Sequence, residues 1–323
     1  MNSIDKIEPL FFIDDEIKSL IKVINQKLKR IDVDDEQRKE YLISKSRVRS
    51  IHSSLAIEAN SLSLLEVSMI SKDNQVQGSA KEVTEVKNAV ELYNKIDEYD
   101  YKSENDLLSA HKVMMNLLTN DYGEYRKHGE AVKDGDEIIY IAPDSIIVPS
   151  LMKSLFEYIN NSKDNLMLLS IMFHYYFVVI HPFSDGNGRI ARFWSSLMLI
   201  KYNESFKFIP IEEDIYLSQK EYYDVIRKCH VNGNANEFIK YMLKVIKSSI
   251  DRVNYINDHI LNYYQFRILE LVAYDKNITQ QEIAKKLKIS IRTVKRHFKT
   301  LMLNEFISRI GSSKNGHWEI IVI

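Results

Sequence analysis

The chain has 323 residues, of which 45% are apolar and 28% charged, and this composition is typical of a folded soluble protein of about two domains. A formal net charge of −1 excludes a strong overall electrostatic preference for nucleic acid or for anionic membranes. Cys229 is the only cysteine, which excludes an intramolecular disulfide and a thiolate metal site. Because the N-terminus lacks the basic-then-apolar pattern of a signal peptide, we expect a cytoplasmic protein.

Helical periodicity dominates the first 260 residues and predicts a mainly α fold. Apolar residues recur every three or four positions in seven stretches, at 15–60, 80–100, 105–119, 149–160, 166–180, 188–202 and 235–260. The stretch 166–180 is the most apolar of these, but it is shorter than the roughly 20 residues that a membrane span needs. We therefore expect a buried core helix there and no membrane partner.

One segment departs from the helical pattern. The sequence EAVKDGDEIIYIAP (130–143) places a β-rich run after Asp134-Gly135, a dipeptide that favours a hairpin turn. A single hairpin has no sheet to join in a helical domain, so we expect it at the surface, near a functional site. An ordinary solvent-exposed hairpin is the alternative.

The C-terminal region has a different pattern. Thr279 and Glu282 form a capping box that opens a short helix, and a turn at 288–290 precedes a second helix, IRTVKRHFKTLML. The apolar face of this second helix is predicted to hold Ile291, Val294, Phe298 and Leu301, and its basic face Arg292, Lys295, Arg296 and Lys299. Two strands around a Lys-Asn-Gly turn complete the pattern of a winged helix-turn-helix, with the domain boundary at 250–262.

This region carries eleven Lys and Arg against five Asp and Glu from Tyr263 to the end, a net charge of +6. The basic face suits phosphate contacts in a DNA groove. DNA is therefore one candidate partner, and docking of a protein or a second subunit is the other.

The stretch HPFSDGNGRIAR (181–192) concentrates reactive residue types between two predicted helices. Gly186 and Gly188 allow close approach of a ligand to the backbone, and the N-terminus of the following helix attracts anions. Arg189 and Arg192 are three residues apart in its first turn, so together they suit a polyphosphate. Asp185 beside such a site suggests Mg²⁺, which is usually held by one or two carboxylates plus substrate phosphates.

His181 completes this group of residues as a candidate general base, because its ordinary pKa of about 6.5 suits proton transfer at neutral pH. Together these residue types indicate attack of a hydroxyl group on a nucleotide phosphate. A calcium loop is excluded, because counting from Asp185 its sixth and twelfth positions hold Ile190 and Ser196 in place of Gly and Glu. A core histidine followed by a capping loop is the remaining structural alternative.

The stretch resembles the signature of the Fic family, His-x-Phe-x-Asp/Glu-Gly-Asn-Gly-Arg-x-x-Arg, at every fixed position. The resemblance implies a Fic-type helical bundle that transfers AMP from ATP to a protein hydroxyl and releases pyrophosphate. Gly188 stands where a Doc-type kinase of this family would carry lysine. The segment 123–143 resembles the family's flap, an edge hairpin that aligns the target by β-augmentation.

The resemblance also assigns roles to individual residues. It implies that His181 deprotonates the target Ser, Thr or Tyr, that Asp185 holds Mg²⁺, and that Phe183 anchors the loop. The remaining residues that it implies for ATP binding are Gly186, Asn187, Gly188, Arg189, Arg192, Tyr222 and Tyr223, of which the two tyrosines would line the adenine pocket.

An inhibitory motif of the family, Ser/Thr-x-x-x-Glu-Gly/Asn, is similar to the sequence SSLAIEAN at 53–60. The resemblance implies that Glu58, one helical turn after Ser54, pairs with Arg192 and blocks the γ-phosphate. Ala59 replaces the Gly or Asn that suits the left-handed residue after a helix. One interpretation is that the helix cap has moved to Asn60.

The predicted organisation is an N-terminal helical region (1–104) with the inhibitory helix at about 45–60, a Fic core (105–250), and a winged helix-turn-helix (251–323). The predicted function is that of an autoinhibited adenylyltransferase with Mg²⁺ as cofactor and ATP as co-substrate, acting on a target protein or on its own chain. The alternatives are a DNA-binding regulator whose Fic core senses nucleotide, and a hydrolase in which Glu58 activates water to remove AMP. The sequence is also compatible with a homodimer.

Overall fold

In the computed structural model the described residues are 10–31, 36–134, 137–258, 263–304, 306–311 and 316–321. They form two compact units, Met1–Asp251 and Arg252–Ile323. Residues before and after position 104 belong to the same compact unit. The predicted mainly helical fold is confirmed in both units.

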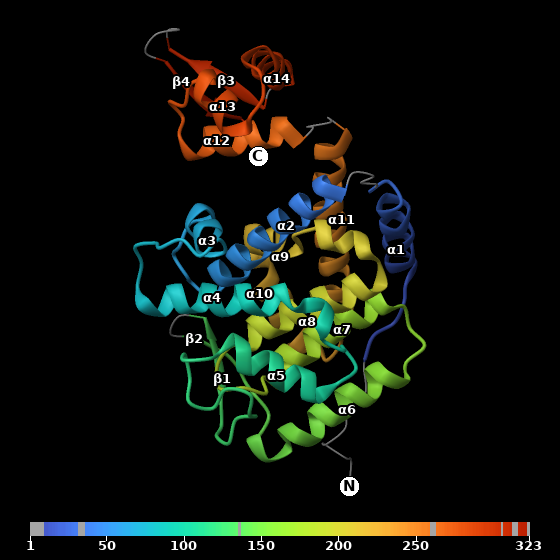
Figure 1. Ribbon diagram of the computed structural model, residues 1–323. Helices are drawn as coiled ribbons and strands as arrows, with labels where there is room; N and C mark the ends of the chain where they lie inside the picture. The colour runs from blue at the N-terminus through green and yellow to red at the C-terminus, as the bar shows by residue number, and fades with distance from the viewer. Residues whose placement is uncertain are drawn as a thin grey trace. The chain divides into compact units, whose positions relative to one another are not determined.

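The first unit consists of helices and one hairpin (Figure 1). Its elements are α1 (Asp15–Leu28), α2 (Glu36–Ile57), α3 (Leu64–Ile70), α4 (Ala80–Asn94), α5 (Glu104–Met114), β1 (Ala131–Asp134), β2 (Glu137–Ile141), α6 (Val148–Asn161), α7 (Leu166–Ile180), α8 (Asn187–Tyr202), η3 (Glu204–Phe208), α9 (Ile211–Leu217), α10 (Gln219–Asn232) and α11 (Asn236–Asp258). The helical stretch expected at 15–60 is thus two helices, α1 and α2. Helices α9 and α10 lie outside the seven stretches that periodicity indicated.

Helices α7 and α8 form the centre of this unit and pack against each other. All but three residues of α7 are buried, which explains why its sequence is apolar on every face. Helix α6 packs against α7, while α5 and α2 pack against α8, so the loop between α7 and α8 is surrounded by other elements. Within the described residues, no helix is long and apolar enough to cross a membrane.

The hairpin pairs β1 with β2 in antiparallel register, Ala131 with Ile141 and Asp134 with Glu137, and has a bulge after Val132. Its end is closed by a hydrogen bond from the Ala142 amide to the carbonyl oxygen of Glu130 (3.0 Å). Figure 1 shows it at the edge of the unit, beside α5. Of the predicted turn dipeptide Asp134-Gly135, Asp134 ends β1 and Gly135 lies outside the described residues.

The second unit contains α12 (Tyr263–Tyr274), α13 (Gln280–Leu287), α14 (Ile291–Leu303), β3 (Ile307–Ile310) and β4 (His317–Ile320). The predicted capping box is present, because Thr279 accepts from the Glu282 amide and Glu282 accepts from the Thr279 amide. Strands β3 and β4 pair antiparallel as the wing. The predicted turn residues Lys314 and Asn315 lie outside the described part of the chain.

The two faces of α14 differ in burial. Val294, Phe298 and Leu301 are fully buried in the core of the second unit, as the apolar pattern predicted. Ile291, predicted for the same face, is the first residue of the helix and is 38% exposed.

Candidate active site

His181 lies at the end of α7 in a left-handed backbone conformation (φ 51°, ψ 60°). Its amide closes the helix by donating to Phe177 (3.0 Å), and Pro182 prevents the helix from continuing. The half-buried ring places Nδ1 3.4 Å from the carbonyl oxygen of Val178, which can only accept. Nδ1 therefore carries the proton in the neutral ring, and Nε2 is left as the basic nitrogen.

The pKa of His181 lies below its ordinary value, chiefly because burial disfavours the charged imidazolium. The contact with the Val178 carbonyl and the charge of Glu130 oppose this shift only in part. The imidazole is consequently neutral at pH 7 and can accept a proton.

The loop after His181 is held by its own side chains. Phe183 is fully buried, and the side chain of Asn187 donates to its carbonyl (2.7 Å) and accepts from its amide (2.9 Å). Both polar atoms of the Asn187 amide group are thus used to shape the loop. This loop-shaping role comes in addition to the ATP-binding role that the resemblance implies for Asn187.

The loop turns into α8 at Gly186, which has φ 82°. A Cβ atom there would lie 2.6 Å from the sulfur of Met115, so both the backbone angle and the packing require glycine. The first turn of α8 then directs its amide groups and its positive dipole end into the site, as anion binding requires.

Asp185 and Arg189 face each other at this helix end. Arg189 Nη2 lies 2.8 Å from Asp185 Oδ1, and its Nη1 lies 3.4 Å from Glu85. The side chain of Asp185 is half exposed, while that of Arg189 is buried. Among the described residues no group of three or more His, Cys, Asp or Glu could hold a metal ion. A single half-exposed carboxylate fits Mg²⁺ only in the mode in which phosphates supply further ligands.

Arg192 is one turn further along α8 and is fully buried. Its Nη2 lies 2.7 Å from Glu58 Oε1, and it also donates to the hydroxyl and the carbonyl oxygen of Ser54 (both 2.9 Å). Burial is the largest single influence and would lower the pKa of Arg192, but the charge and hydrogen bond of Glu58, together with Tyr222 and Tyr223, raise it above its ordinary value. Ser54 and Glu58 therefore meet Arg192 together from α2.

Glu58 also lies against Gly188, at the N-terminus of α8. A Cβ atom at Gly188 would collide with the Glu58 carboxylate and would lie 3.0 Å from Arg192 Nη1. The carboxylate therefore occupies the anion-binding end of this helix.

Ala59 follows Glu58 with φ 65°, in the left-handed region. The interpretation that the cap has moved to Asn60 is therefore wrong. Asn60 is buried, and its side chain donates to Glu85 (2.8 Å) and accepts from the Leu62 amide (3.1 Å). Because these hydrogen bonds fix the side chain of Asn60, Ala59 is the residue that adopts the left-handed conformation after the helix.

Tyr222 and Tyr223 lie side by side on α10, with ring centroids 5.1 Å apart. Tyr222 is buried, its hydroxyl contacts His174 Nε2 at 2.8 Å, and burial raises its pKa above the ordinary value. Tyr223 is only half-buried and lies near Arg192. Of the pair, Tyr223 is thus the more accessible to a ligand.

Sequence reasoning missed two residues that hold the site. Arg126 is buried and donates to the carbonyl oxygens of His181 (2.7 Å), His128 (2.7 Å) and Pro143 (2.5 Å). It thereby joins the end of α7 to the base of the hairpin. No spacing in the sequence distinguishes this arginine from its neighbours.

His111 is the second missed residue and stacks on Phe183 with ring centroids 3.6 Å apart. Its Nδ1 accepts from the Gly123 amide (2.8 Å), so its Nε2 donates to the carbonyl oxygen of Asp185 (3.0 Å). Burial lowers its pKa to about 4, which keeps the ring neutral.

In the second unit, the four basic side chains predicted for one face of α14 are all exposed: Arg292, Lys295, Arg296 and Lys299. The wing places Arg309 over the ring of Trp318 (4.6 Å). The basic face is therefore accessible within this unit.

Comparisons with known proteins agree with this geometry. Residues 101–199 match the Fic/DOC family, and residues 261–308 match the family described as winged helix-turn-helix DNA-binding. The protein adenylyltransferase fic-1 of Caenorhabditis elegans is 26% identical over 230 residues, which cover 66% of this chain and 43% of the relative. A probable protein adenylyltransferase of Aquifex aeolicus is 38% identical over 60 residues, covering 18% of this chain and 19% of the relative. The chain thus spans less than half the length of these relatives.

Among solved structures, a Fic family protein from Desulfovibrio desulfuricans G20 is similar over almost the entire chain. It has a TM-score of 0.75 and 29% identity, covering 97% of this chain and 98% of the other. A segment of C. elegans Fic-1 has a TM-score of 0.60 at 20% identity, covers 73% of this chain and 70% of the other, and supports the fold alone. The chain therefore contains a Fic/DOC family domain, followed by a winged helix-turn-helix domain.

Proposed function

We propose that this protein is a protein adenylyltransferase that moves AMP from ATP to the hydroxyl of a Ser, Thr or Tyr, on a target protein or on its own chain. One observation carries the proposal. A neutral, basic histidine at the end of α7 adjoins the anion-binding N-terminus of α8, inside a Fic domain whose relatives in C. elegans and A. aeolicus bear the name adenylyltransferase.

In the proposed reaction the target hydroxyl loses its proton to His181 Nε2 as its oxygen attacks the α-phosphorus of ATP. A new bond forms between that oxygen and phosphorus, and the bond from the α-phosphorus to the bridging oxygen breaks. Pyrophosphate leaves with the bonding electrons. The lowered pKa of His181 supports this role, because an unprotonated base is the form that can act.

The phosphates of ATP would bind the first amide groups of α8, beside Gly188, in the place that Glu58 now occupies. Arg189 and Arg192 would neutralise their charge from the same turn. Asp185 is the carboxylate that would hold Mg²⁺, which supplies charge neutralisation when it is bound together with the phosphates.

The hairpin of β1 and β2 is the proposed docking site for the target segment, which would add to its edge through main-chain hydrogen bonds. Two observations support this role. The hydroxyl of Tyr140 donates to the carbonyl of Val178, one turn before His181, and Arg126 joins the hairpin base to His181 itself. A target segment bound there would thus be held in a fixed position relative to the general base His181.

We further propose that the ion pair between Glu58 and Arg192 inhibits transfer. The carboxylate uses the guanidinium that the γ-phosphate needs, and it occupies the end of α8. ATP could then bind productively only after Glu58 moves away.

The test is incubation with Mg²⁺ and ATP that carries ³²P at either the α or the γ position, followed by gel electrophoresis. We expect α-label on protein, a stronger signal in Glu58→Gly, and none in His181→Ala. Label from the γ position would indicate a kinase. Absence of α-label in Glu58→Gly, with target present and ATP binding intact, would refute the transferase.

A second function, DNA binding by the winged helix-turn-helix, is favoured by the exposed basic face of α14. The measurement is fluorescence anisotropy with duplex DNA across a salt series. We expect Arg292→Ala with Arg296→Ala to weaken binding and to reduce the salt slope by about 0.9 for each phosphate that is no longer neutralised. The matched control pair, Lys220→Ala with Lys228→Ala, removes two exposed charges from α10 of the first unit.

A further inference from the structure

Glu212 of α9 is a carboxylate with an exposed fraction of only 2%. In the described part of the chain, three hydroxyl groups from three other helices donate to it: Ser50 of α2 (2.6 Å), Ser196 of α8 (2.7 Å) and Tyr93 of α4 (3.2 Å). Because a buried carboxylate is unfavourable unless its oxygens are satisfied, these hydroxyl groups are held in place around it.

The position of this group repeats the inhibitory contact one helical turn away. On α2, Ser50 lies four residues before Ser54, so the two share one face, and Glu58 follows four residues later, directly after the last residue of the helix. On α8, Ser196 lies four residues after Arg192. Ser54 and Glu58 meet Arg192, while Ser50 and Ser196 meet at Glu212. The contacts of Arg192 and the contacts of Glu212 therefore lie one helical turn apart along the same interface between α2 and α8.

Tyr93 links these two levels. Its hydroxyl donates to Glu212 and also interacts with the hydroxyl of Ser54. Burial, reinforced by the charge of Glu212, raises the pKa of Tyr93 well above its ordinary value, so its hydroxyl keeps its proton. Hydrogen bonds and polar contacts thus run continuously from Glu58 to Glu212.

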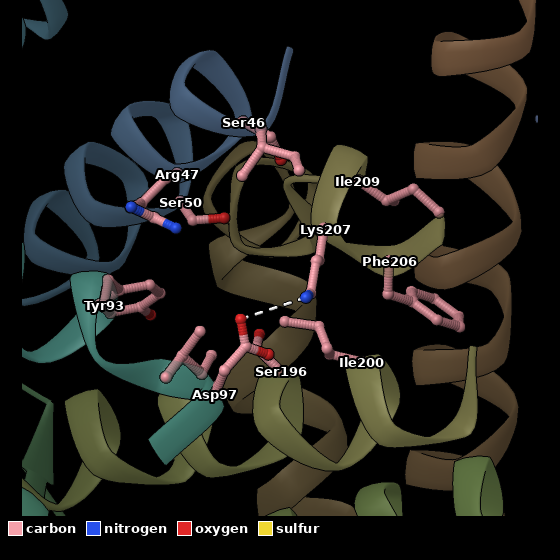
Figure 2. A pocket seen from close by; sticks show the side chains of 12 residues that line it. Ser46, Arg47, Ser50, Tyr93, Asp97, Ser196, Ile200, Phe206, Lys207 and Ile209 are labelled. Atoms are coloured by element: carbon pink, nitrogen blue, oxygen red, sulfur yellow. Dashed lines mark hydrogen bonds and ion pairs between the residues drawn. The ribbon is translucent and has the colours of Figure 1, made fainter. Parts of the chain in front are cut away.

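Figure 2 shows a small hollow beside this group. Ser46, Ser50, Tyr93 and Ser196 all line it. The hydrogen bonds between these hydroxyl groups and the Glu212 carboxylate therefore add to the apolar packing of Ile51 and Leu55 that holds α2. The ion pair of Arg49 with Glu213 (2.8 Å) adds a second link from α2 to α9.

We propose that Glu212 is a positioning residue for the inhibitory contact and that it acts through the hydroxyl of Ser50. By fixing α2 against α8, it keeps Glu58 on Arg192. This inference rests on the proposed function, because Glu58 is taken there as the inhibitory group. Without the Ser50 hydroxyl, α2 is held less firmly, Glu58 leaves Arg192 more often, and the γ-phosphate gains its site.

The test compares Ser50→Ala in two backgrounds, with α-³²P-ATP and Mg²⁺. We expect a three- to ten-fold gain in labelling in the otherwise native protein and no gain in Glu58→Gly, where the inhibitory carboxylate is already absent. Ser50→Thr keeps the hydroxyl, so it should label like the native protein. The control Ser46→Ala changes another buried serine of the same hollow that is not among the three donors.

Equal changes in both backgrounds would overturn the proposal, because Ser50 would then act on the fold as a whole. No change in either background would overturn it as well. A second measurement, hydrogen–deuterium exchange of the amides of 51–58, requires no catalytic activity. We expect faster exchange in Ser50→Ala than in Ser46→Ala, and equal exchange contradicts the proposal.

These two measurements also separate the proposal from the proposed function. If Glu58→Gly fails to label while exchange in Ser50→Ala is faster, the transferase assignment fails and the positioning of α2 by Glu212 stands. If Glu58→Gly labels strongly and Ser50→Ala exchanges faster without a gain in labelling, the transferase stands and this proposal fails.

Discussion

Arg126 Nε lies 2.7 Å from the carbonyl oxygen of His181, and the same guanidinium reaches the carbonyl oxygens of His128 and Pro143 at the base of the hairpin. His181 has a left-handed backbone, which a non-glycine residue adopts only when its surroundings hold it there. Arg126 thus fixes the direction of the His181 backbone relative to the hairpin where we propose that the target docks.

We predict that Arg126→Lys lowers kcat by about 100-fold, because small displacements of a catalytic group have effects of this size. A lysine keeps the charge but cannot reach three carbonyl groups from one planar fork. The KM for ATP should change little, since Arg126 contacts no residue that we assign to the phosphates. Steady-state kinetics in the Glu58→Gly background, free of the inhibitory carboxylate, provide the measurement.

The control for this prediction is Lys127→Ala. Its side chain is 83% exposed and pairs with Glu124 on the surface. It should leave kcat unchanged. A variant Arg126→Lys that raised the KM for ATP with normal kcat would contradict a positioning role.

The pH dependence of kcat/KM should show a general base with a pKa below that of a free histidine. Burial holds the pKa of His181 below the ordinary value of 6.5, so the basic form persists at pH values where a free histidine is mostly protonated. We expect the acidic limb of the profile in Glu58→Gly to have its midpoint below pH 6.5. A midpoint at or above pH 6.5 would show that another group, or a protonated His181, controls the rate.

The sequence alone predicted the local parts of this site, because the motif at 181–192 encodes a helix end, a tight loop and a helix start within twelve residues. The capping box at Thr279 and the apolar face of α14 were likewise readable from short-range spacing. In each case the determining interactions join residues close together in the chain.

The remaining features depend on interactions between distant segments. Arg126, His111 and Glu212 hold groups that lie 55, 74 and 162 residues away, and their neighbours in sequence give no sign of this. Tyr222 could be identified as part of a tyrosine pair, but its hydrogen bond with His174 depends on the packing of α10 against α7. The strain at Ala59 is visible only in the backbone angle.

Two buried histidines should make the protein less stable in mild acid. Burial lowers the pKa of His174 to about 3 and that of His111 to about 4, whereas both titrate near 6.5 when the chain unfolds. Below pH 6.5 the unfolded state therefore binds more protons than the folded state, and stability falls as the pH falls. Each histidine contributes about 1.4 kcal/mol per pH unit between pH 6.5 and 5.

Urea unfolding at pH 7, 6 and 5 measures this dependence. We expect His111→Gln to reduce the slope of unfolding free energy with pH, because it removes one of the two groups. The control is His128→Gln, at a histidine whose side chain is 59% exposed. A slope that is the same in all three proteins would mean that His111 is not neutral in the folded state.

The same substitution should have opposite effects at two alanines near the end of α2. At Ala59, with φ 65°, a left-handed alanine costs about 1 kcal/mol that glycine avoids. We therefore expect Ala59→Gly to raise the free energy of unfolding by about 1 kcal/mol. At Ala56, inside α2, glycine should lower it by about the same amount, because it weakens a regular helix.

Thermal or urea denaturation compares the two variants directly, and α-³²P labelling reports their effect on the inhibitory contact. Because Ala59 follows Glu58, relief of its strain should stabilise the closed arrangement and lower basal labelling, whereas Ala56→Gly should raise it. Two variants that both lose stability would show that the left-handed angle at Ala59 is not strained, and the stability of the inhibitory contact would then have to come from other interactions of α2.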